Sequence, residues 1–320
     1  MIDARAIVDP GARIGANVRI GPWSIIGPDV EIGDECEIDA HVVVRGPTSL
    51  GRGNRIFQFA TVGEGTPALA FRGEPTRLLV GDQNVIREGV TIHRGTVQDR
   101  GETVIGSHNL LMAYVHVGHD CVVGDHCIFA NNASISGHVH VGDRANLGGY
   151  CGVPQFRRIG AHAMVGGMSL VLKDVPDFVM VSGNPARAIG INVEGLHRRN
   201  FPPALIGSIR RAYRTLYRSG LTVDEALQMI AAEPDPEGHL AQFIASVRAA
   251  RHGVVRPRAA SAGEEGGSGA DDPDHGDGLG NGLGDGLGDG HGEGHGEGHG
   301  DGHGDGQGGD GDRDGDRARD

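Results

Sequence analysis

The sequence has few aromatic residues, no long apolar run and little net charge outside one segment. Only 13 of its 320 residues are Phe, Trp or Tyr, whereas 57 are glycine. No stretch of eighteen apolar residues occurs, and the N-terminus lacks a charged segment followed by an apolar one. These absences speak against a membrane span and against secretion, so we expect a cytoplasmic protein.

The acidic residues are concentrated near the C-terminus. The formal net charge is −13, yet residues 261–320 alone hold 17 acidic residues against three arginines. The rest of the chain is nearly neutral and lacks the basic excess of a nucleic-acid-binding surface, so we expect no nucleic-acid partner. Residues 254–320 are rich in Gly, Asp and His, cannot form a core, and are predicted to be a disordered tail.

A strict six-residue repeat runs through the first part of the chain. Ten aliphatic residues recur at every sixth position from Val8 to Val62, and the phase resumes at 80–92 and 105–171. Neither the strand period of 2 nor the helix period of 3.6 explains this spacing, whereas three short strands per turn of a coil do. The sequence predicts a parallel β-helix over 1–190, mainly β in class. Glycines behind the aliphatic residues are expected to accept φ > 0 at its corners.

Two interruptions of the repeat predict loops at about 64–78 and 96–104. The first falls between Val62 and Val80, and the second shifts the phase by one residue between Ile92 and Ile105. Long loops in a regular scaffold usually serve a functional site. We therefore expect the functional residues to lie near them.

The four cysteines all occupy the second inward position of the repeat, which otherwise holds small or apolar residues. They are Cys36, Cys121, Cys127 and Cys151. Their spacing matches no zinc or redox motif, so we predict buried, reduced packing residues.

Residues 191–253 change to a helical pattern. Leu205, Ile209 and Leu216 lie at helical spacing, Thr222 and Glu225 form a capping-box signature, and 238–251 predict a third helix. We predict a small α-helical domain that covers the open end of the β-helix.

A cluster of polar residues is predicted on the outside of the coil. His116 and His119 flank the inward Val117, Asp120 follows, and His138 lies one full turn of three repeats above position 120. Such a cluster fits a solvated surface, a zinc site, or a histidine general base oriented by a carboxylate. Spacing alone does not separate catalysis from metal binding.

Several segments resemble one enzyme family, in the same order along the chain. They are Gly73–Arg77, Val90–Thr96, His116–Cys121, Ala130–Ala133, Ser136–Val139 and Asn192–Arg199. The sequence resembles the UDP-N-acetylglucosamine O-acyltransferases of lipid A biosynthesis over residues 1 to about 250. The resemblance implies a left-handed β-helix, a homotrimer, and transfer of a hydroxyacyl chain from acyl carrier protein to the 3-hydroxyl of UDP-N-acetylglucosamine. It implies neither a cofactor nor a bound metal.

The resemblance also implies roles for individual residues. His119 would be the general base, Asp120 would orient it, and the N–H of Gly137 would face the developing oxyanion. Gly167 would govern acyl-chain length. The remaining implied substrate contacts are His93, His116, Asn132, His138, Gln155, Asn192, Glu194, Arg198 and Arg199, the last four holding the uridine and diphosphate.

Three positions depart from the family pattern. Pro154 replaces a histidine, and Ala68 and Ala70 replace an Asp and a Lys in the first loop. Two alternatives follow from these changes: a related transferase with another nucleotide sugar or a coenzyme A donor, and a β-helix whose site has decayed. A zinc-binding β-helix protein is a third alternative, from another class.

Overall fold

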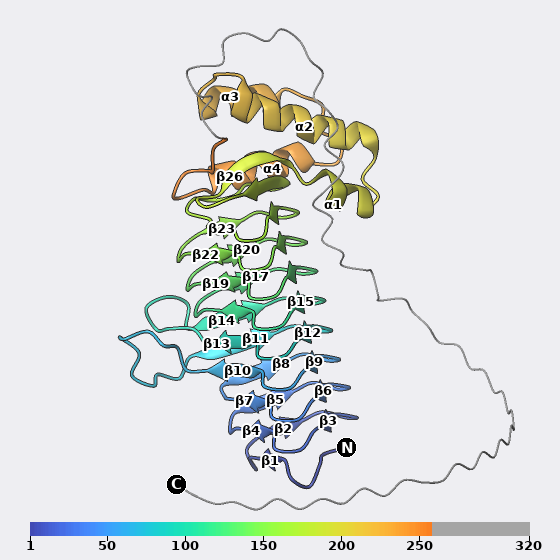
Figure 1. Ribbon diagram of the computed structural model, residues 1–320, viewed down its shortest axis with the longest axis vertical. Coiled ribbons are helices and arrows are strands. Elements are labelled where there is room, and N and C mark those ends of the chain that lie inside the picture. Colours follow the sequence, from blue (N-terminus) through green and yellow to red (C-terminus); the bar gives the residue numbers. More distant parts are fainter. Residues whose placement is uncertain (258–320) are drawn as a thin grey trace, which may run out of the picture. The chain divides into compact units, whose positions relative to one another are not determined.

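The structure, a computed structural model, describes residues 1–257 (Figure 1). These residues belong to one compact unit that holds a β-helix followed by four helices. Most of the predicted tail at 254–320 lies outside the described residues. Among the described residues, no helix has the length and apolar character needed to cross a membrane.

Three sheets run along the β-helix, and within each sheet the neighbouring strands are hydrogen-bonded. In spatial order the first sheet contains β1 (Ile7–Val8), β4 (Ile25–Ile26), β7 (Val43–Val44), β10 (Thr61–Glu64), β13 (Thr91–His93), β16 (His116–Val117), β19 (Ser134–Ile135) and β22 (Gly152–Val153). The second contains β2 (Arg13–Ile14), β5 (Val30–Ile32), β8 (Thr48–Leu50), β11 (Arg77–Val80), β14 (Glu102–Ile105), β17 (Val122–Val123), β20 (His140–Val141) and β23 (Arg158–Ile159).

The third sheet is the longest and carries the only antiparallel pair among the described strands. It contains β3 (Arg19–Ile20), β6 (Glu37–Ile38), β9 (Arg55–Ile56), β12 (Val85–Ile86), β15 (Leu110–Leu111), β18 (Ile128–Phe129), β21 (Asn146–Leu147), β24 (Met164–Val165), β25 (Val179–Ser182) and β26 (Arg187–Ile191). β25 pairs in parallel with β24 and antiparallel with β26, which ends the β-helix.

The predicted inward positions form a continuous core. From Ile20 onward the repeating aliphatic residues are buried, and the small residues between them are buried as well. All four cysteines are buried and free, as predicted. Burial raises the pKa of the Cys121, Cys127 and Cys151 thiols to about 12, so these groups stay protonated and unreactive at neutral pH.

The strands meet at three corners, which we number by the sheets they join. The first corner leads from the first sheet to the second and includes 118–121, 136–139 and 154–157. The second corner leads from the second sheet to the third and includes 124–127, 142–145 and 160–163. The third corner returns to the first sheet and includes 130–133, 148–151 and 166–169.

The prediction that the repeat glycines supply positive φ at the corners is wrong for most of them. The residue with positive φ is the third after the aliphatic residue, for example Asn17, Glu35 or Asp120, and it is seldom glycine. The glycine directly behind the aliphatic residue is required by close packing instead. A Cβ on Gly33 would lie 2.6 Å from the carbonyl carbon of Gly51 in the next coil, closer than any side chain tolerates.

Both predicted loops exist, but each is an insertion in a single corner. β10 and β11 lie in the first and second sheets, so the long segment from Val62 to Val80 replaces a corner that elsewhere takes a single repeat. The loop itself covers 65–76. The second loop covers 94–101, between β13 and β14, again at the first corner. Both loops therefore emerge beside each other, one coil apart (Figure 1).

The helices stack on the last coils, as predicted. They are α1 (Val193–Arg198), α2 (Pro203–Arg218), α3 (Val223–Ala231) and α4 (His239–Arg248). The predicted capping box of Thr222 and Glu225 is present at the start of α3. The backbone N–H of Asp177 in the last coil donates to Ser246 Oγ of α4 at 3.0 Å, which ties the helices to the β-helix.

Candidate active site

His119 and Asp120 form a buried pair at the first corner. His119 Nδ1 lies 2.7 Å from Asp120 Oδ2, and the two residues are only 9% and 1% exposed. An ionised carboxylate can only accept a hydrogen bond, so Nδ1 of His119 must be the donor. The lone pair of the neutral ring is then on Nε2. This tautomer is the one that a histidine general base requires.

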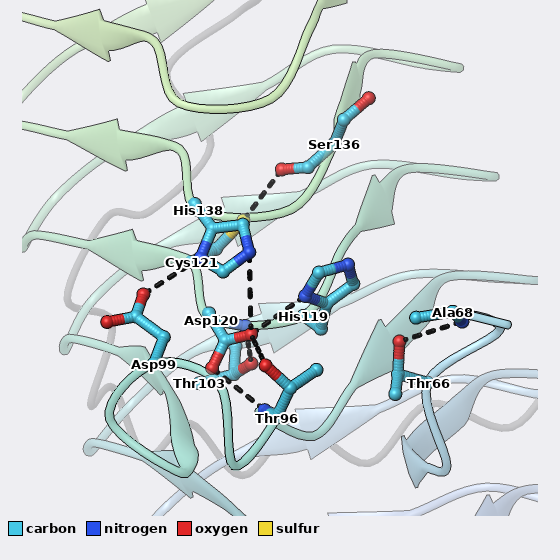
Figure 2. A network of polar contacts seen from close by, with 10 residues as sticks. All are labelled: Thr66, Ala68, Thr96, Asp99, Thr103, His119, Asp120, Cys121, Ser136 and His138. Atoms are coloured by element: carbon cyan, nitrogen blue, oxygen red, sulfur yellow. Dashed lines mark hydrogen bonds and ion pairs between the residues drawn. The ribbon is translucent and has the colours of Figure 1, made fainter. Parts of the chain in front are cut away.

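The second loop holds Asp120 in place. The backbone N–H and the Oγ1 of Thr96 donate to the two carboxylate oxygens at 2.8 and 2.7 Å. The backbone N–H of Asp120 itself donates to Thr103 Oγ1 at 2.8 Å. Figure 2 shows Thr96 below Asp120, with both of its bonds reaching the carboxylate. The predicted cluster does lie outside the coil, but this loop covers Asp120.

Gly137 lies against the His119 ring. A Cβ at this position would be 2.6 Å from His119 Nε2, so only glycine leaves the imidazole in place. The N–H of Gly137 has no hydrogen-bond partner among the described residues. A free backbone donor therefore lies beside the free nitrogen of His119.

His138 joins the cluster from the next coil. Its ring is perpendicular to that of His119, with centroids 4.9 Å apart, and it stacks on Phe156 at 4.4 Å. Its Nδ1 lies 2.8 Å from Asp99 Oδ2, and its Nε2 lies 3.9 Å from Asp120 Oδ2 (Figure 2). The repeat predicts no contact for either Asp99 or Thr96, because both contacts depend on how the second loop folds back.

His93 and His116 form a second histidine pair on the first sheet. Their ring centroids are 5.3 Å apart, and Thr91 Oγ1 lies 2.8 Å from His116 Nδ1. Burial lowers the pKa of His93 to about 4 and also lowers the pKa of His116; His116 adds to the effect on His93, and His119 adds to the effect on His116. Both rings are therefore neutral at pH 7 and act as hydrogen-bonding groups rather than as cations.

The remaining predicted residues lie outside the cluster of His119, Asp120 and His138. Gln155 is exposed on the first corner, one coil above Gly137. Asn132 and Gly167 lie on the third corner. A Cβ on Gly167 would come no closer than 3.3 Å to Gly149 O, so the chain's own packing does not demand glycine there.

The segment Asn192–Arg199 surrounds α1 and packs on the second corner. Asn192 caps the helix by accepting from the N–H of Gly195 at 3.0 Å, and its Nδ2 donates to the carbonyl of His162. Arg199 is half-buried and donates to the carbonyl of Arg144 at 2.9 Å. Glu194 and Arg198 form an exposed ion pair at 3.0 Å. The predicted site residues are thus divided between the first sheet and the three corners of this chain.

One group of possible metal ligands occurs within residues 1–257. His119, Asp120 and His138 each offer one ligand atom, and these atoms lie within 4.8 Å of one another. However, the Nδ1 of His119 is committed to Asp120, and that carboxylate already accepts from Thr96. A metal ion bound by all three residues would therefore compete with Thr96 for the Asp120 carboxylate.

The six-residue coil with a buried His–Asp pair defines a hexapeptide-repeat transferase. The six-repeat bacterial transferase hexapeptide model matches residues 11–46 and 102–137, and the model of UDP-N-acetylglucosamine O-acyltransferase domain 2 matches residues 174–255. The chain is 58% identical to an acyl-[acyl-carrier-protein]–UDP-N-acetylglucosamine O-acyltransferase of Azotobacter vinelandii over 256 residues, which are 80% of this chain and 99% of that protein. A Stutzerimonas stutzeri relative of the same name is 56% identical over the same shares. The chain belongs to this family of acyltransferases.

Solved structures agree with this assignment. The structure of LpxA from Acinetobacter baumannii matches with a TM-score of 0.78 and 49% identity, over 80% of this chain and 99% of that one. The likeness confirms the predicted left-handed β-helix with C-terminal helices.

Proposed function

We propose that this enzyme transfers a hydroxyacyl chain from acyl carrier protein to the 3-hydroxyl of UDP-N-acetylglucosamine, the first step of lipid A biosynthesis. The observation that carries this mechanism is the buried His119–Asp120 pair beside the unbonded N–H of Gly137. A nucleophile, a base and an oxyanion donor are the parts that acyl transfer needs. The names of the relatives support this donor and acceptor over coenzyme A or another sugar.

In the proposed reaction, His119 Nε2 takes the proton of the sugar 3-hydroxyl as its oxygen attacks the thioester carbonyl. Asp120 keeps the ring in the required tautomer and stabilises the imidazolium that forms. The negative charge that develops on the carbonyl oxygen is stabilised by the N–H of Gly137. The C–S bond then breaks, the proton passes to the carrier thiolate, and the products are the sugar ester and free carrier thiol. No cofactor takes part.

The substrate contacts fit an assembly of several copies of the chain, and we infer a homotrimer. The catalytic pair lies on the first corner, Gly167 on the third, and α1 with Arg199 on the second. One nucleotide sugar together with the acyl chain cannot reach three corners of a single coil, whereas neighbouring copies can bring different corners together. Large apolar side chains also remain exposed along the third corner: Trp23, Phe59, Tyr114, Tyr150 and Met168.

The direct test is product identification. The purified full chain would be incubated with hydroxyacyl carrier protein and UDP-N-acetylglucosamine, and the ester would be detected by mass spectrometry over a panel of acyl-chain lengths. We expect an ester from the wild type and a loss of at least about 100-fold in kcat for His119→Ala. An inactive wild type, or an active His119→Ala, would refute the mechanism.

A separate experiment tests whether each active site uses residues from two chains. Inactive His119→Ala and Arg199→Ala chains would be co-expressed and purified together through two different tags. If each site uses residues from two chains, mixed assemblies regain part of the activity that both parents lack. Sedimentation of the wild type gives the number of copies, and a monomer with full activity would contradict the assembly.

The zinc alternative is favoured only by the three ligand atoms of His119, Asp120 and His138. Elemental analysis of the purified chain decides it, because a structural or catalytic zinc ion would be present at one per chain. We expect less than about one-tenth of that amount, with activity unchanged by a chelator.

A further inference from the structure

The second loop contributes one carboxylate that the mechanism above does not use. Asp99 lies in the 94–101 segment, and its Oδ2 is 2.8 Å from His138 Nδ1. The loop is fixed at both ends: Thr96 is bonded to Asp120, and Arg77 and Glu102 form an ion pair at its base at 2.7 Å. Asp99 is therefore presented to His138 by an anchored segment.

His138 has defined neighbours on several sides. Asp99 faces Nδ1, Asp120 lies 3.9 Å from Nε2, the His119 ring is perpendicular to it, and Phe156 stacks on its face at an interplanar angle of 9°. Since a carboxylate only accepts hydrogen bonds, Asp99 requires the proton of His138 to be on Nδ1. This leaves Nε2 as the nitrogen that faces the site.

We propose that Asp99 is a positioning residue of this acyltransferase, which fixes the tautomer and the ring orientation of His138 for contact with the acceptor sugar. Together, Thr96 and Asp99 make the second loop the support for both carboxylate–histidine pairs. The role of His138 at the sugar rests on the proposed function, whereas the Asp99–His138 pair itself rests on geometry alone.

The kinetic test uses three variants of the full chain. Asp99→Ala removes the acceptor, Asp99→Asn keeps an acceptor oxygen without the charge, and Gln98→Ala changes a neighbouring exposed residue of the same loop. We expect Asp99→Ala to raise the KM for UDP-N-acetylglucosamine about tenfold with kcat within about threefold, the loss of one bond to a charged group. Asp99→Asn should restore most of this loss, and Gln98→Ala should match the wild type.

A double-mutant cycle shows whether Asp99 acts through His138. In a His138→Ala background, Asp99→Ala should change KM by less than about twofold, because its partner is already absent. An equal effect of Asp99→Ala in both backgrounds would overturn the proposal, and so would an unchanged KM in the single variant.

A spectroscopic test needs no turnover. The full chain would be labelled with 15N-histidine, and the His138 resonances would be assigned by comparison with His138→Ala. We expect a protonated Nδ1 in the wild type and a shift toward protonated Nε2 in Asp99→Ala. Identical spectra would refute the proposal. Because this result is independent of ester formation, it separates failure of the Asp99 assignment from failure of the proposed function.

Discussion

The same backbone N–H group is hydrogen-bonded at the second corner but unbonded at Gly137 on the first corner. At the second corner, the N–H of the second residue after the aliphatic residue donates to an Asp side chain of the next coil. Asp34 accepts from Ala16 at 2.7 Å, and Asp143 accepts from Asp125 at 2.9 Å. At the first corner the corresponding residues above His119 are Gly137 and Gln155, and no carboxylate is supplied.

This difference explains why a free N–H is found where catalysis needs one. The Gly137 N–H is unbonded because the residue one coil above it is Gln155 rather than Asp. On the second corner the Asp side chains form a ladder: each accepts a hydrogen bond from a backbone N–H of the preceding coil, which stabilises the stack of coils. On the first corner the missing ladder residue leaves a donor for an oxyanion.

The largest expected effect comes from adding a ladder residue to the first corner. Gln155→Asp should place a carboxylate on the Gly137 N–H, as Asp143 does for Asp125. Blocking one oxyanion donor lowers kcat by roughly 100-fold or more. Steady-state kinetics with Gln155→Ala as the comparison measures this effect. If the Asp variant is as active as the Ala variant, the N–H of Gly137 is not the oxyanion donor.

The last ladder residue, Asp177, gives the next largest effect. It accepts from the N–H of Ala161 and from Gln242 Nε2, and burial raises its pKa to about 6 from an ordinary value of 3.8. The folded state then holds the proton more tightly, so stability falls as pH rises from about 4 to 6. The change amounts to about 3 kcal/mol, since one pKa unit is about 1.4 kcal/mol.

Urea unfolding at pH 4.5 and 7.5 measures how the free energy of unfolding changes with pH. Asp177→Asn should flatten this slope, whereas Ser246→Ala, which removes a bond to the same residue without a titrating group, should lower stability equally at both values. An unchanged slope in Asp177→Asn would show that another group causes the pH dependence.

Glycines of the second and the third corner should differ in how much an added methyl group lowers the free energy of unfolding. Gly33→Ala places its Cβ 2.6 Å from backbone and should cost about 2–3 kcal/mol. Gly167→Ala meets only Gly149 O at 3.3 Å and should cost less than about 1 kcal/mol. Its predicted effect is on substrate, a shift toward shorter acyl chains. Thermal unfolding and a chain-length panel test both parts, and an unaltered chain preference would remove Gly167 from the site.

A smaller loss of stability than that of Gly33→Ala is expected from removing one Asp of the ladder at the second corner. Asp125→Ala removes the acceptor of the Ser107 N–H, which lies at 2.6 Å. Because that N–H is accessible to water, the loss should be about 1 kcal/mol with kcat unchanged. A comparable fall in kcat would mean that the second corner does not serve stability alone.

The repeat predicted the coil, its inward residues and the position of both loops correctly. The role predicted for the repeat glycines was wrong for most of them. A period in the sequence does not show which residue of the corner has positive φ and which one packs closely against the next coil. The repeat predicted a loop at 64–78 as an interruption of the coil, but only the sheet pairing shows that the segment from Val62 to Val80 bridges a single corner, between β10 and β11.

The candidate site was predicted in part. His119, Asp120, Gly137 and His138 meet because each turn of three repeats stacks on the one before it, and that spacing is visible in the sequence. The contacts of Thr96 and Asp99 were not predicted, because irregular loops follow no period and the partners lie 24 and 39 residues away.

The sequence by itself determined the coil, because burial of one aliphatic residue in every six leaves no other regular structure. It also determined which side chains lie outside the coil. Only the tertiary structure decided which of these become a site. The second loop covers Asp120, Gly137 keeps an unbonded N–H, and Asp99 reaches His138, since each result depends on contacts between segments that no repeat relates.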